Sequence, residues 1–161
     1  MSQIESRLQA LGLALPAALV LPPGVKLPFP WVRIHGNRAY VSGHAAQNAD
    51  GSLATPLGKV GLDVSLEQAQ RLAQLTALSI LASLKRELGN LDRISAWLRV
   101  FGMVNSAPGF KQQPAVINGF TDLIVELYGS PRGLHARSAV GMAELPFGIP
   151  VEIEAEVAIE G

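Results

Sequence analysis

The stretch His135–Ile159, HARSAVGMAELPFGIPVEIEAEVAI, contains two strand-like runs joined by a connection that carries proline and glycine. In the second run, apolar and acidic residues alternate, and this period of two is typical of a strand with one buried face. The face opposite the apolar one holds Glu152, Glu154 and Glu156, where a solvated glutamate is the ordinary interpretation. The predicted buried face is Val151, Ile153, Ala155, Val157 and Ile159.

Arg137 opens the first run on a face of small residues, Ala139, Gly141 and Ala143. The space in front of it would let the planar guanidinium present parallel N–H groups to a carboxylate. Removing an unpaired charge from water is costly, so Arg137 either faces solvent or is held there for a purpose.

The composition is typical of a globular protein and argues against a nucleic-acid-binding, disordered or membrane-spanning one. The 161 residues fit one domain that can bury a core, and 13 basic side chains balance 13 acidic ones, so the basic surface of a nucleic-acid-binding protein is missing. A hydrophobic content of 48% with only 16% charged residues excludes disorder. The low charge and the positive mean hydropathy predict an oligomer in which partner chains cover much of the surface. Without cysteine, a signal-peptide pattern or an apolar run of membrane-spanning length, we expect a cytoplasmic protein with no membrane partner.

Upstream of the C-terminal stretch, capping and turn signals predict a short helix, a hairpin and two long helices separated by a strand. In that strand, alternation places Ile94 and Val100 on one face and Trp97 on the other. The predicted elements are a helix over Ser2–Leu11, an extended Pro-rich segment over residues 13–30, a hairpin over Trp31–Gly43, a helix from Ser65 to just before Gly89, a strand within Leu91–Val104 and a helix over Gln112–Tyr128.

These elements predict an α+β fold, in which a mixed sheet of four to six strands carries both long helices on one face. The other face then needs cover, and association with copies of the same chain is the simplest source of it.

Few sequence motifs for catalysis are present. His35, His44 and His135 lack the spacing of metal ligands, so we expect no metal, and no glycine-rich nucleotide-binding motif occurs. Ser42 is not in a nucleophile elbow. Asn118, inside a predicted helix, is either an exposed residue or an amide that binds a substrate or ties down a loop.

The C-terminal stretch closely resembles the signature of the RidA/YjgF family. The matching residues are Arg137, Val140, Leu145-Pro146 and Val151-Glu152-Ile153-Glu154-Ala155, at the family's spacing and without a gap. The resemblance extends over residues 29–160 through Pro30-Trp31-Val32, Val41-Ser42-Gly43 and Ile117-Asn118, and is greatest to the longer branch sometimes labelled endoribonuclease L-PSP. We therefore divide the chain into an N-terminal helix and Pro-rich arm, residues 1–28, and a RidA/YjgF-like domain, residues 29–161.

The resemblance implies the chorismate-mutase-like α+β fold and a homotrimer with a cleft at each subunit interface. It also implies hydrolysis of reactive enamines and imines, such as 2-aminoacrylate, to 2-keto acids and ammonia without a cofactor. In that activity Arg137 would bind the carboxylate of a small anionic substrate, and Glu152 would orient or activate water.

The other positions that match the family's site are implied to bind the substrate. Ser42, Gly43, His44 and Asn118 would position substrate or water, and Trp31 would form part of an apolar wall. His44 stands where the family commonly has Gln, which leaves the identity of the substrate open.

The sequence is also compatible with two other functions. One is a non-catalytic trimer that binds small carboxylates in a regulatory role. The other is the endoribonuclease or translation-inhibitor activity with which some relatives are labelled. The balanced charge and the aromatic content of 6% argue against nucleic acid as a partner.

Overall fold

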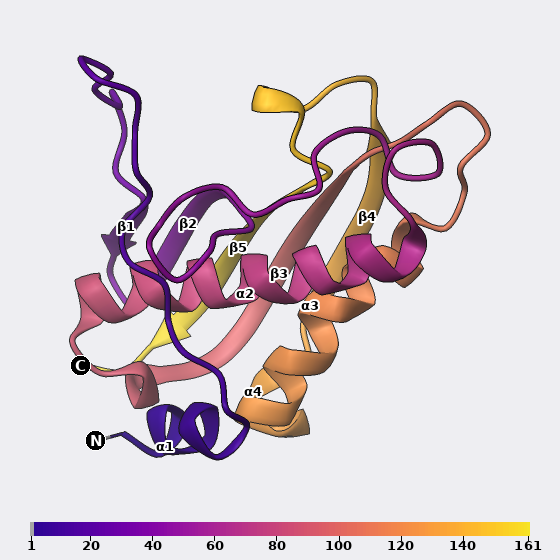
Figure 1. Cartoon of the computed structure of the whole chain (residues 1–161). Coiled ribbons are helices and arrows are strands. Elements are labelled where there is room, and N and C mark those ends of the chain that lie inside the picture. Colours follow the sequence, from indigo (N-terminus) through magenta and orange to yellow (C-terminus); the bar gives the residue numbers. More distant parts are fainter. Residues whose placement is uncertain (1) are drawn as a thin grey trace.

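The computed structural model describes residues 2–161. Five strands form one sheet in the order β1-β2-β5-β3-β4, antiparallel except for the pair β3-β4. Helices α2 and α3 lie together on one face of this sheet (Figure 1), which confirms the predicted α+β fold. The helices are α1 (Gln3–Ala10), α2 (Leu66–Leu88), α3 (Gln113–Tyr128) and α4 (Ser130–Gly133), and the strands are β1 (Val32–His35), β2 (Arg38–Ala45), β3 (Ile94–Asn105), β4 (Ala136–Met142) and β5 (Val151–Ile159).

The two long helices begin and end close to where the sequence predicts. The Ser65 side chain accepts a hydrogen bond from the backbone of Gln68, the Gln68 side chain accepts one from the backbone of Ser65, and α2 ends at Gly89 with φ 75°. In residues 2–161, no helix combines the length and the apolar character that a membrane span requires. Helix α3 lies close to β3 because Gly102 has no side chain: a Cβ there would come within 2.6 Å of Ile117.

Strand β3 departs from the alternation expected of it. Its register against β5 shifts between Ile94 and Ala96 and again between Trp97 and Arg99, so two bulges each add a residue. Trp97 therefore faces the helices together with Ile94, is 1% exposed, and packs against Phe120 and Tyr128. The prediction that Trp97 lies on the opposite face from Ile94 is wrong for this reason.

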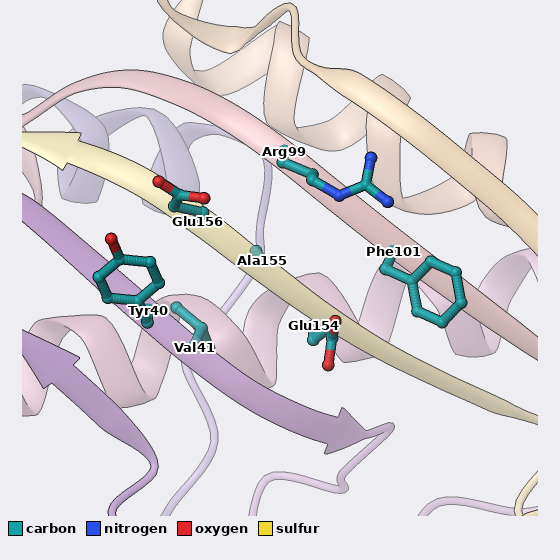
Figure 2. Close-up of a pocket in the computed structure, with 7 residues that line it drawn as sticks. All are labelled: Tyr40, Val41, Arg99, Phe101, Glu154, Ala155 and Glu156. Carbon is teal, nitrogen blue, oxygen red and sulfur yellow. The ribbon is translucent and has the colours of Figure 1, made fainter.

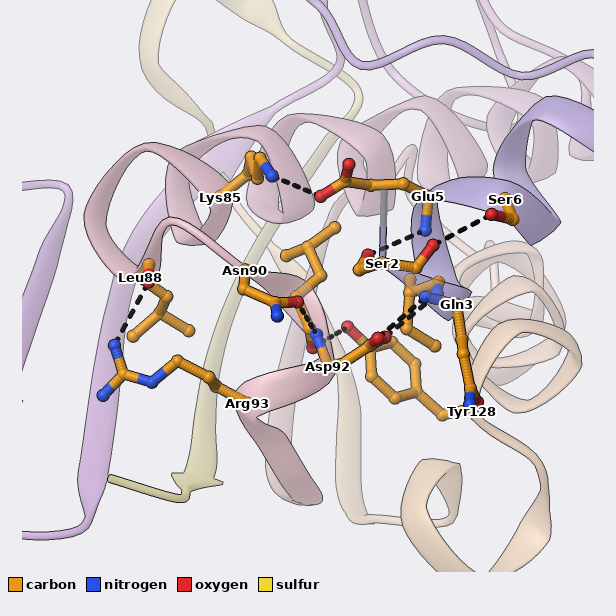
Figure 3. A network of polar contacts seen from close by, with 12 residues as sticks. Ser2, Gln3, Glu5, Ser6, Lys85, Leu88, Asn90, Asp92, Arg93 and Tyr128 are labelled. Atoms are coloured by element: carbon orange, nitrogen blue, oxygen red, sulfur yellow. Dashed lines mark hydrogen bonds and ion pairs between the residues drawn. The ribbon is translucent and has the colours of Figure 1, made fainter.

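Helix α1 is fixed at one end of the molecule, beside the turn that precedes β3. The carboxylate of Asp92 accepts hydrogen bonds from the backbone N–H groups of Gln3, at 2.7 Å, and Ile4, at 3.0 Å (Figure 3). Glu5 forms an ion pair with Lys85 of α2. The side chain of Ile4 is fully buried, so α1 contributes to the core of the fold.

The sheet face that points away from α2 and α3 carries polar and aromatic side chains. Figure 2 shows Tyr40, Arg99, Phe101, Glu154 and Glu156 rising from β2, β3 and β5 around a hollow of about 310 Å³. Tyr40 and Arg99 are both paired with Glu156 across the strands, and both are exposed. We call this surface the open face of the sheet.

Candidate functional site

Glu152, near the start of β5, points away from the core. Its neighbours Val151 and Ile153 are buried under the helices, so the alternation of the strand places Glu152 on the open face. The carboxyl group lies directly over Gly43, where a Cβ would come within 2.7 Å of Oε2. Partial burial raises the pKa of Glu152, and the nearby charge of Glu154 raises it further. Such a carboxylate is better suited to take up a proton near neutral pH than an ordinary glutamate.

A cavity of about 190 Å³ opens beside this carboxyl group, and we call it the Glu152 pocket. Three of the predicted site residues, Trp31, Gly43 and Glu152, come together in its wall. The full lining is Leu19, Val20, Leu21, Pro22, Trp31, Gly43, Ala45, Leu53, Pro146, Phe147, Ile149 and Glu152. Apart from Glu152, every lining side chain is apolar, so the pocket offers one ionisable group beside an apolar surface.

A bulge in β2 brings Gly43 under Glu152. The register of β2 against β5 shifts between Val41 and His44, which leaves Ser42 and Gly43 outside the regular pairing. The Ser42 hydroxyl donates to the carbonyl of Pro30 at 2.9 Å, and its backbone N–H donates to the carbonyl of Trp31 at 3.0 Å. Ser42 thus holds the segment that carries Trp31 against the bulge.

His44 lies beneath the wall of the pocket and is 4% exposed. Its Nδ1 is 2.6 Å from the carbonyl oxygen of Ser42, which can only accept, so Nδ1 carries the proton. Nε2 then accepts from the hydroxyl of Ser83 at 2.8 Å, and Ser83 in turn accepts from Arg86 at 2.9 Å. The ring stacks at a tilt against Trp31, with centroids 4.9 Å apart. Burial lowers the pKa of His44 to about 4, with a smaller contribution from Arg86.

Arg137, on the edge strand β4, points toward the helices. Its Nη1 donates to Oδ1 of Asn118 at 2.9 Å and to Oγ1 of Thr121 at 3.0 Å, and its Nη2 donates to the carbonyl of Pro114 at 3.4 Å. The structure therefore brings together the predicted residues Arg137 and Asn118. Thr121 was not predicted, although its position three residues after Asn118 places both on one face of a helix.

His135 supports the same cluster. Its Nδ1 lies 2.7 Å from the carbonyl oxygen of Gly133 and therefore carries the proton, while Nε2 lies 3.0 Å from the hydroxyl of Thr121. Thr121 thus links the ring of His135 to the guanidinium of Arg137. Burial lowers the pKa of His135, and the neighbouring charge of Arg137 lowers it further. A neutral ring is the form that accepts from Thr121, so the cluster carries the charge of Arg137 alone.

The two predicted catalytic residues do not meet within one chain. Arg137 is paired with Val100 of β3, whose side chain is buried under the helices, and Glu152 is paired with Met103, three residues further along β3. Gly102 packs against α3, so its neighbour Met103 and the paired Glu152 lie on the other side. Two clusters of site residues therefore lie on opposite faces of the sheet, Arg137 with Asn118 on one and Glu152 with Trp31 and Gly43 on the other.

Among residues 2–161, no three His, Cys, Asp or Glu side chains gather closely enough to hold a metal ion.

Known proteins similar to this chain cover nearly its whole length. Protein TCP17 of Trypanosoma cruzi is 36% identical over 157 residues, which span 98% of this chain and 94% of that protein. Atu1372, a protein of unknown function from Agrobacterium tumefaciens, has 43% sequence identity to this chain, and its crystal structure matches with a TM-score of 0.88. The match covers 98% of this chain and 93% of that protein. The crystal structure of a candidate endoribonuclease of Shewanella oneidensis MR-1 matches with a TM-score of 0.85 at 27% sequence identity. The match covers 97% of this chain and 99% of that protein.

The chain belongs to the RidA/YjgF family. RidA of the Antarctic bacterium Psychrobacter sp. PAMC 21119 has the same fold, with a TM-score of 0.53 at 21% identity over 85% of this chain and 93% of that one. No protein-family model matches the chain, so the individual relatives and the signature around Arg137 and Glu152 carry the assignment.

In this member of the RidA/YjgF family, sequence reasoning missed one wall of the Glu152 pocket. Residues 19–22 of the N-terminal arm and Phe147 of the β4–β5 connection line it. The sequence does indicate that this segment packs on the domain, because Leu15, Leu19, Val20, Leu21 and Val25 are apolar enough to pack on a core. Nothing in the sequence indicates which part of the domain that segment contacts.

Proposed function

We propose that this RidA/YjgF-family protein hydrolyses small reactive enamines and imines of the 2-aminoacrylate type to 2-keto acids and ammonia. The observation that carries the proposal is the position of Glu152, a partly buried carboxyl group with a raised pKa, over Gly43 and beside an apolar pocket. A carboxyl group in such surroundings suits proton transfer to and from water.

The proposed reaction needs only one proton-transfer group and the correct positioning of water and imine. The enamine tautomerises to the imine, and R–C(=NH2+)–COO− plus H2O gives R–CO–COO− plus NH4+. Glu152 takes a proton from the water that attacks the C=N carbon and returns it to the nitrogen of the tetrahedral intermediate. Ammonia then leaves and takes up the proton that the hydroxyl group loses, which gives the keto acid and NH4+. Orienting the water toward the C=N carbon lowers the remaining activation barrier, so the proposed reaction requires no cofactor.

Arg137 binds the carboxylate of the substrate in this proposal. A guanidinium has five N–H donors, and the bonds to Asn118, Thr121 and Pro114 engage three of them. The others are available for a carboxylate, and the planar fork favours two parallel hydrogen bonds. The contacts to α3 fix the guanidinium in place before the substrate arrives.

The positions of the two clusters support a site shared between protomers. Because Arg137 and Glu152 lie on opposite faces of one sheet, we propose a homotrimer in which Arg137 of one protomer faces the Glu152 pocket of the next. The open face, with its exposed Tyr40 and Val140, supports this arrangement, since contact with another protomer would cover it.

The direct test is release of ammonia and pyruvate from 2-aminoacrylate generated in place by a serine dehydratase, corrected for uncatalysed hydrolysis. We expect the wild-type protein to accelerate release and Arg137→Ala to lose the acceleration. Arg71→Ala, which removes an exposed arginine on α2, is the matched control and keeps full activity. Equal rates for the wild-type protein and Arg137→Ala would reject the proposed role of the guanidinium.

A second candidate is RNA cleavage, which is favoured by the description of the Shewanella relative as an endoribonuclease. The equal numbers of acidic and basic side chains weigh against it, because RNA binding depends on a surplus of positive charge. Incubation with single-stranded RNA at low and high salt discriminates the two activities. Salt-sensitive cleavage that Arg137→Ala abolishes, without ammonia release from 2-aminoacrylate, would select the nuclease.

A further inference from the structure

The N-terminal arm is held firmly against the loop that follows β2. The backbone N–H of Ala17 donates to the carbonyl of Ala49 at 3.0 Å, and that of Val20 donates to the carbonyl of Gly51 at 3.1 Å. Gly51 fits so closely that a Cβ on it would come within 2.2 Å of the carbonyl oxygen of Ala18. The arm segment 19–22 is therefore a fixed wall of the Glu152 pocket.

Phe147 forms another part of that wall in an unusual backbone conformation. With φ 59° and ψ 13° it is the one residue other than glycine with positive φ in residues 2–161. Its side chain is 71% exposed, so burial within the chain does not account for a phenylalanine at this position. A bulky residue in the left-handed region points to a functional constraint. The Glu152 pocket, which Phe147 lines, is the feature that can impose this constraint.

The size of the pocket indicates how large a group it can hold. An apolar cavity of about 150 Å³ lined by aliphatic and aromatic side chains accommodates benzene. The Glu152 pocket has a volume of about 190 Å³ and an apolar lining except for Glu152. The single terminal carbon of 2-aminoacrylate would fill only a small part of it.

We infer that the arm segment 19–22 and Phe147 bind the side chain of the substrate and make the protein selective for 2-imino acids with bulky apolar side chains, of leucine or phenylalanine size. The inference rests on the proposed function, because Glu152 beside this wall is the group that directs water. The reaction is unchanged: water adds to the C=N carbon and ammonia leaves. The pocket contributes by burying the side chain, and each additional buried carbon strengthens binding.

The experiment compares imines that an amino-acid oxidase generates from leucine, phenylalanine and alanine, with semicarbazide as the competing trap and catalase present. We expect kcat/KM for the leucine- and phenylalanine-derived imines to exceed that for the alanine-derived imine by about 10-fold or more. Phe147→Gly tolerates the positive φ and removes the ring, so it should fold and lower this ratio, as should Leu21→Ala. Leu134→Ala, at an exposed leucine outside the pocket, should leave the ratio unchanged.

Failure of this inference and failure of the proposed function give different results. Equal kcat/KM for all three imines, or a ratio that Phe147→Gly and Leu21→Ala leave unchanged, overturns the inference alone. Absence of hydrolysis with every imine overturns the proposed function. In that case calorimetric binding of 4-methyl-2-oxopentanoate and pyruvate decides about the pocket: tighter binding of the larger acid that Phe147→Gly weakens supports the wall as a binding surface, and equal affinities overturn it.

Discussion

Arg137 and Glu152 lie on opposite faces of one sheet, on strands that are both paired with β3. Arg137 contacts helix α3, whereas Glu152 stands over Gly43 on the face without helices. A reaction that uses both groups on one small substrate therefore needs two copies of the chain.

This relationship predicts complementation between two inactive variants. When Arg137→Ala and Glu152→Gln chains are refolded together in equal amounts, a shared site is intact if its arginine comes from one variant and its glutamate from the other. Random assembly should restore about a quarter of the wild-type activity. About half of the sites receive an intact arginine, and about half of those also receive an intact glutamate from the neighbouring protomer. Each variant refolded alone is the control. Mixed assemblies seen by native mass spectrometry without any recovered activity would contradict the shared site.

Glu154 should shift the pH dependence of the proposed reaction. Its charge contributes to the raised pKa of Glu152, after the larger effect of burial. Glu154→Gln removes that charge and lowers the pKa of Glu152, so a proton-accepting Glu152 remains active at lower pH. We expect the acidic limb of the kcat/KM profile to move to lower pH.

The exposed Glu160 offers the control for this measurement, since it lies beyond the end of β5. Glu160→Gln should leave the profile in place. An acidic limb that stays where it is in Glu154→Gln, or moves to higher pH, would exclude Glu152 as the group that titrates.

Asp92 should stabilise the fold by capping α1 from a distant part of the chain. Its carboxylate accepts the backbone N–H groups of Gln3 and Ile4, which a helix N-terminus otherwise leaves without partners (Figure 3). Asp92→Ala should lower the free energy of unfolding by about 1–2 kcal/mol, as loss of a helix cap does. Urea denaturation measures this, and Asp122→Ala, at an exposed position on α3, should change it by less than about 0.5 kcal/mol. Equal stabilities of the two variants would show that the cap contributes little.

The sequence predicts local features of this protein well, because capping and turn residues act on their near neighbours. The predicted helix from Ser65 and the predicted hairpin over Trp31–Gly43 are both present, as α2 and as the pair β1-β2. The bulges in β2 and β3 depend on pairing with β5, so alternation could not place Trp97. The wall formed by residues 19–22 depends on hydrogen bonds to the loop at Ala49 and Gly51, a contact that no local pattern encodes.

His44 illustrates the same limit in the site itself. The family resemblance implies a group that binds substrate, whereas the structure places the ring under Trp31 with both nitrogens bonded within the chain. In the proposed site, His44 would be a positioning residue that holds the bulge at Ser42 and Gly43.

The lowered pKa of His44 makes this support depend on pH. Because burial lowers the pKa from 6.5 to about 4, the unfolded chain takes up a proton more readily than the folded one between these values. The contribution to stability is complete above pH 6.5 and is lost as the pH falls toward 4, by about 3 kcal/mol in total at 1.36 kcal/mol per unit. His44→Gln cannot take up this proton, so the difference in unfolding free energy between wild type and variant should shift in favour of the variant as the pH falls. Urea denaturation across this range measures the shift, with His35→Gln, at an exposed position in β1, as control. A difference that stays constant with pH would mean that His44 is not held neutral by the fold.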